Sequence, residues 1–62
     1  MLEYTKTVLQ KVSFNRELFS KELRKAFKWL QKEELVMLQA WCVMMFSDQY
    51  HDVISEVFRN LS

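Results

Sequence analysis

The most apolar stretch of the chain runs from Leu35 to Phe46, where Gln39 is the only polar residue. At a rotation of about 100° per residue, a helix over this stretch presents apolar side chains on every side. We expect its bulkier side to fill the core, and this side consists of Leu35, Leu38, Cys42 and Phe46. The opposite side faces outward as a predicted interface, formed by Val36, Met37, Ala40, Val43 and Met44. A short chain cannot cover both sides by itself, which predicts a partner surface.

Two further helices are predicted before this stretch. The first covers about residues 3–12, and its apolar arc consists of Tyr4, Val8, Leu9 and Val12. The second begins near Arg16, with Asn15 as its N-cap and with Phe14 and Phe19 as a hydrophobic staple. Its buried stripe consists of Phe19, Leu23, Ala26, Phe27 and Leu30.

The boundaries of the apolar helix leave one alternative open. One continuous helix over residues 16–46 would keep a single apolar stripe, but Glu33 and Glu34 interrupt that stripe and suit the first turn of a new helix. We therefore favour a break near Gln31 and Lys32. After Phe46, the N-caps Ser47 and Asp48 predict a fourth helix, whose apolar face consists of Tyr50, Val53, Ile54, Val57, Phe58 and Leu61.

The chain has 62 residues and contains neither Gly nor Pro, on which the tight turns of β-hairpins depend. Together with the helical spacing, this composition predicts an all-α fold, a compact bundle of three to four short helices in one domain, residues 1–62. A domain of this size buries only about 60% of the surface of its unfolded chain. Cys42 is the only cysteine, so an internal disulfide is excluded and oligomerisation is expected to complete the fold.

Charge is distributed unevenly, although the net charge is only +1. Residues 1–32 carry eight Lys and Arg against three Glu, a net charge of +5, whereas residues 33–62 carry one Arg against five acids, a net charge of −4. Five of the basic residues share one side of the second helix with an aromatic residue at its border. This predicted anion-binding or partner-binding set consists of Lys21, Arg24, Lys25, Lys28, Lys32 and Trp29.

Such a basic side could follow a nucleic-acid backbone while an aromatic ring stacks on a base. The isoelectric point of 7.9 is below the value of about 9 that is typical of nucleic-acid-binding domains. A solvated helix face explains the lysines better than nucleic-acid binding does. An acidic protein partner or the acidic half of a second copy would suit these lysines as well as nucleic acid would. Binding to a membrane surface is disfavoured because the core needs the apolar side of this helix.

No catalytic, metal or cofactor motif is found. Asp48, His51 and Asp52 lie close together in sequence. A transition-metal site needs three or four converging ligands, and the only cysteine, Cys42, lies in the apolar stretch rather than near these residues. Adjacent Glu33 and Glu34 diverge by about 100° and form no acid–base pair. We therefore expect neither an enzyme nor a metal or other cofactor.

The amino-terminal residues lack the features of a signal peptide, and the twelve residues 35–46 are fewer than the about 20 that a membrane-spanning helix needs. We expect a cytoplasmic protein without a membrane span. The leading hypothesis is a small helical protein–protein interaction module that self-associates through its apolar third helix, as a homodimer. The alternative is a small nucleic-acid-associated regulator that uses the basic side of the second helix.

Overall fold

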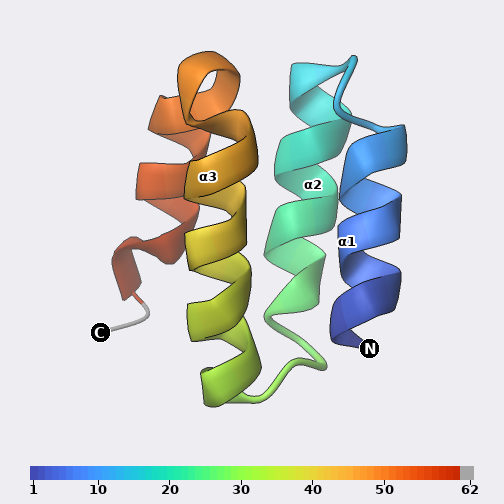
Figure 1. Ribbon diagram of the computed structural model, residues 1–62, viewed down its shortest axis with the longest axis vertical. Helices are drawn as coiled ribbons and strands as arrows, with labels where there is room; N and C mark the ends of the chain where they lie inside the picture. The colour runs from blue at the N-terminus through green and yellow to red at the C-terminus, as the bar shows by residue number, and fades with distance from the viewer. Residues whose placement is uncertain (61–62) are drawn as a thin grey trace.

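The computed structural model describes residues 1–60 and consists of three α-helices followed by a short 3-10 helix (Figure 1). Helix α1 spans Leu2–Lys11, α2 spans Arg16–Ala26, α3 spans Lys32–Val57, and the 3-10 helix η1 spans Phe58–Asn60. Consecutive helices run in opposite directions and lie side by side (Figure 1). No strand occurs within these residues, and the predicted all-α fold is confirmed.

The start of α2 is defined by a side-chain cap. The Asn15 side-chain oxygen accepts a hydrogen bond from the backbone N–H of Leu18 at 3.0 Å, which confirms the predicted N-cap. The predicted staple is wrong in one partner: Phe19 is fully buried, but Phe14 stays 77% exposed. Phe14 lies in the turn before the cap, where the chain directs its ring to solvent.

Replacement of Asn15 by alanine removes this acceptor and leaves the N–H of Leu18 without its capping partner. We expect Asn15→Ala to lower the free energy of unfolding by about 1 kcal/mol, within a usual range of about 0.5–2 kcal/mol. Urea unfolding followed by circular dichroism measures this change. Asn15→Asp keeps the acceptor and serves as the control, so an equal loss in both variants would show that the cap is not the cause.

The break between α2 and α3 is confirmed near the predicted position. Helix α2 ends at Ala26, a turn follows, and α3 begins at Lys32. The backbone N–H of Gln31 donates a hydrogen bond to Oε1 of Glu34 at 2.9 Å, so Glu34 helps to start the new helix. A continuous helix over residues 16–46 is excluded by this turn.

A further helical segment follows a break in α3, but the predicted start of this fourth helix at Ser47 or Asp48 is wrong. The chain stays helical through these residues, and the one non-helical residue within α3 is Tyr50, with φ −128° and ψ 30°. After this kink the last part of α3 runs back along the bundle (Figure 1). The Tyr50 ring stacks on Phe19 at 4.4 Å, and its hydroxyl donates a hydrogen bond to the carbonyl oxygen of Ser13. These tertiary contacts hold the kink two residues beyond the expected caps.

The core draws on all three helices. The predicted inward side of the apolar stretch is buried, and it consists of Leu35, Leu38, Cys42 and Phe46. On α1 the predicted arc is partly wrong, because Tyr4 is 64% exposed while Thr5 is buried. The Thr5 hydroxyl donates a hydrogen bond to the carbonyl oxygen of Met1 at 2.8 Å, which satisfies its polar group inside the bundle. The buried hydrophobic residues are Leu9, Phe19, Leu23, Ala26, Leu30, Leu35, Leu38, Cys42, Phe46, Tyr50, Val53, Ile54, Val57 and Phe58. Leu61, predicted for the last apolar face, lies outside the described residues.

Candidate interaction surfaces

The outward side of α3 is an exposed apolar surface. The exposed fractions are 50% for Val36, 54% for Met37, 48% for Val43 and 78% for Met44, and Ala40 at the centre is also exposed. We call these five residues the apolar face. Their outward direction agrees with the sequence pattern, which placed them opposite the buried side of the same helix.

One edge of the apolar face is closed by Trp41, which packs against the core. The Trp41 ring meets Phe46 edge to face at 5.4 Å, and the Lys6 ammonium of α1 lies 5.8 Å from the centre of the indole ring. This cation–π contact joins α1 to α3 and fixes the border of the surface. No residue from Leu35 to Phe46 is charged, so the contacts that the apolar face can make are mainly apolar.

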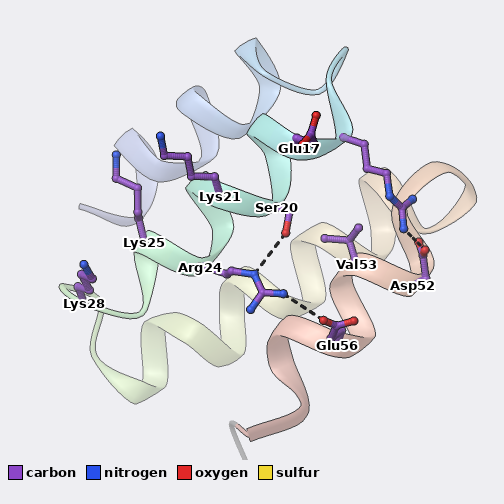
Figure 2. A pocket seen from close by; sticks show the side chains of 10 residues that line it. Glu17, Ser20, Lys21, Arg24, Lys25, Lys28, Asp52, Val53 and Glu56 are labelled. Carbon is purple, nitrogen blue, oxygen red and sulfur yellow. Dashed lines mark hydrogen bonds and ion pairs between the residues drawn. The ribbon is translucent and has the colours of Figure 1, made fainter.

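The basic residues of α2 divide into two groups. The arginines turn toward the returning part of α3 and form ion pairs there: Arg16 with Asp52, and Arg24 with Glu56 at 3.1 Å (Figure 2). Arg24 also donates a hydrogen bond to the Ser20 hydroxyl at 3.4 Å. The basic and acidic halves of the chain therefore neutralise each other in part within one molecule.

The lysines form the second group. Lys21 and Lys25 on α2 and Lys28 in the turn after it extend away from the carboxylates of Asp52 and Glu56 (Figure 2). We call these three residues the lysine surface. Lys25 lies 3.5 Å from Glu22 on the same helix, a weak and partly exposed pair.

The six residues predicted as one basic set are not brought onto one side of α2. Lys32 is the first residue of α3, beyond the turn, and is thus separated from that helix. Trp29 lies in the turn after α2, is 50% exposed, and lines a small cavity of about 20 Å³ together with Tyr4 and Ala26. The predicted set required α2 to continue beyond Lys28, but the helix ends at Ala26, so Lys28 and Trp29 lie in the turn and Lys32 lies in α3.

An open groove of about 600 Å³ lies between α2 and the returning part of α3. Its lining is of mixed charge and consists of Arg16, Glu17, Ser20, Lys21, Arg24, Lys25, Lys28, Asp52, Val53 and Glu56. Sequence reasoning did not identify this groove, although the opposite charges of the two halves of the chain were the available signal. Ion pairs with Arg16 and Arg24 occupy two of the groove's three carboxylates, Asp52 and Glu56, whereas Lys21, Lys25 and Lys28 line the part of the groove away from these pairs.

The described residues contain no cluster of three or more His, Cys, Asp or Glu side chains that could hold a metal ion. Asp48, His51 and Asp52 are exposed, and the carboxylate of Asp52 is engaged by Arg16. Burial raises the pKa of the Cys42 thiol to about 12, so this side chain is a neutral core group rather than a thiolate nucleophile.

The pair of Arg16 and Asp52 makes stability dependent on pH. The hydrogen bond from Arg16 lowers the pKa of Asp52 below its ordinary value of 3.8. A carboxyl group whose pKa is lowered by folding contributes stability above its ordinary pKa and loses this contribution as the pH falls through the folded-state pKa. We expect Asp52→Asn to be slightly less stable than the wild type at neutral pH, since the pair is exposed, and the difference to vanish in acid.

Urea unfolding of both proteins at neutral pH and in steps below pH 3.8 measures this dependence. Asp48→Asn removes an exposed carboxylate that forms no ion pair among the described residues, and it is the matched control. A constant difference between wild type and Asp52→Asn across the whole pH range would contradict the assignment.

Within residues 1–60, no helix combines the length and the hydropathy that crossing a membrane requires. Comparison of the chain with known protein families, with curated protein sequences and with solved structures finds no match.

Proposed function

We propose that this protein is a small helical protein–protein interaction module that self-associates as a homodimer through the apolar face of α3. The observation that supports the proposal is the exposure of this face: four of its side chains, from Val36 to Met44, leave about half or more of their surface in water. Contiguous apolar surface of this kind is typical of interaction sites. A twofold dimer lets both copies bury the same face at once.

A second copy is the partner that suits this domain best. A single chain of 62 residues buries a small core, and natural domains of this size commonly gain stability by oligomerisation. The described residues contain one cysteine, buried and free, and no candidate metal cluster, so neither of the other common stabilising devices is found there. Burial of apolar area contributes about 25 cal/mol per Å² toward association, offset by the cost of immobilising the two copies.

Sedimentation equilibrium tests the proposal directly, because the chain mass is 7.6 kDa and the dimer has twice this mass. We expect the wild type to dimerise and Val43→Glu to be monomeric. A glutamate at this position is solvated in the monomer but buried without a partner in the dimer, a cost of several kcal/mol, and each 1.4 kcal/mol weakens the association about tenfold.

Gln10→Glu is the control for this experiment, since it adds the same charge at an exposed position of α1. This variant should dimerise like the wild type, and all three proteins should have the same helical circular dichroism. A wild type that stays monomeric at several hundred micromolar, or a Val43→Glu variant that dimerises normally, would overturn the proposal.

The lysine surface favours a second candidate function, association with nucleic acid. Its three side chains, two on α2 and one in the turn after it, project away from the carboxylates that neutralise the arginines (Figure 2). A mobility shift of single-stranded nucleic acid at micromolar protein, strongly weakened by salt, would support this function. Lys21→Glu combined with Lys28→Glu should then abolish the shift, and the absence of any shift with the wild type would reject it.

A further inference from the structure

The residues along the exposed side of α3 are arranged symmetrically about Ala40. Positions three and four residues before Ala40 hold Met37 and Val36, and positions three and four residues after it hold Val43 and Met44. Seven residues to either side lie Glu33, which is exposed, and Ser47, which is half-buried. At about 100° per residue all of these positions share one side of the helix.

We propose that two copies pair their α3 helices in antiparallel directions about a twofold axis at Ala40, so that Glu33 of one copy meets Ser47 of the other. This inference rests on the proposed homodimer and specifies its geometry. In this arrangement Val36 faces Met44 of the second copy and Met37 faces Val43, so that a methionine meets a valine on both sides of the axis. The small Ala40 at the axis allows the two helices to approach closely.

Charge distinguishes the antiparallel pair from the parallel one. Glu33 is the only charged residue on this side of α3 between residues 33 and 47. A parallel pair would place the two Glu33 carboxylates opposite each other at the interface, where like charges repel. An antiparallel pair separates them by about 21 Å along the axis, since fourteen residues each rise about 1.5 Å.

The antiparallel pair also matches polar groups at both ends of the apolar face. The Ser47 hydroxyl can donate a hydrogen bond to the Glu33 carboxylate of the second copy, since both lie seven residues from the axis. The N-terminal end of each α3 then lies near the part of the other α3 that precedes its kink at Tyr50. The two helix dipoles are then antiparallel, which is the favourable arrangement. The same surface therefore recognises itself in one direction only.

Disulfide cross-linking under mild oxidation tests this geometry, because two cysteines form a disulfide only when their Cα atoms lie within about 7 Å. Ala40→Cys should cross-link with itself. Glu33→Cys alone and Ser47→Cys alone should remain uncross-linked, whereas an equimolar mixture of the two should give the mixed disulfide dimer. The wild type is the control and should give no product, since its single cysteine, Cys42, is fully buried.

The set of outcomes distinguishes failure of the antiparallel geometry from failure of the proposed dimer. A dimeric mass with self-cross-linking of Glu33→Cys would show a parallel pair, which overturns the inference and leaves the proposed function standing. A dimeric mass without any product from Ala40→Cys would place the contact on another surface and overturn both. A monomeric mass at high concentration would likewise overturn both, and the mixed disulfide between Glu33→Cys and Ser47→Cys supports the antiparallel pair.

Discussion

Replacement of Cys42 by glutamate is expected to unfold the protein. Cys42 is fully buried and lies on the inward side of α3, and burial alone raises the pKa of its thiol to about 12. A carboxylate at the same place would lose its hydration without a partner, at a cost of several kcal/mol. The whole stability of a domain of this size is roughly 3–9 kcal/mol, at about 0.05–0.15 kcal/mol per residue. Far-ultraviolet circular dichroism should show the loss of helix in Cys42→Glu.

The neighbouring residue provides the matched control. Val43 is 48% exposed, so the same glutamate placed one residue later can point into water within the monomer. Val43→Glu should therefore keep the helical spectrum and unfold cooperatively in urea. A folded Cys42→Glu variant, or an unfolded Val43→Glu variant, would show that the inward and outward sides of α3 are assigned the wrong way round.

Phe19→Ala is expected to have the second large effect. Its ring is fully buried, meets Phe46 edge to face at 5.0 Å and stacks on Tyr50 at 4.4 Å. Truncation of a buried phenylalanine costs about 3–5 kcal/mol through lost burial and the cavity that remains. It also removes the surface against which Tyr50 stacks at the kink of α3. We expect most of the stability to be lost in urea unfolding.

Phe14→Ala deletes the same ring from a position that is 77% exposed, and its free energy of unfolding should stay within about 0.5 kcal/mol of the wild type. The three proteins must be compared at one protein concentration, because self-association makes apparent stability depend on concentration. A loss for Phe19→Ala no larger than that for Phe14→Ala would contradict the aromatic core described above.

The sequence by itself determined the features that depend on local order. The helical class follows from composition and periodicity, the cap at Asn15 from its hydrogen-bonding side chain, and the break before Lys32 from the acidic residues that follow it. The two sides of the apolar stretch were also predictable, because a rotation of about 100° per residue sorts side chains once a helix is assumed. The sequence pattern was therefore sufficient to predict that the outward side of α3 is exposed.

The tertiary structure alone decided the features that depend on residues distant in the chain. Ser47 and Asp48 signalled a break in this part of the chain, but its position at Tyr50 depends on contacts with Phe19 and Ser13, more than thirty residues earlier. The division of basic residues requires Asp52 and Glu56 to fold back onto α2, which engages the arginines and leaves the lysines exposed. The burial of Thr5 in place of Tyr4 depends on how α1 rotates against its neighbours. Periodicity orders the side chains around one helix, but the packing between helices determines which of them meet.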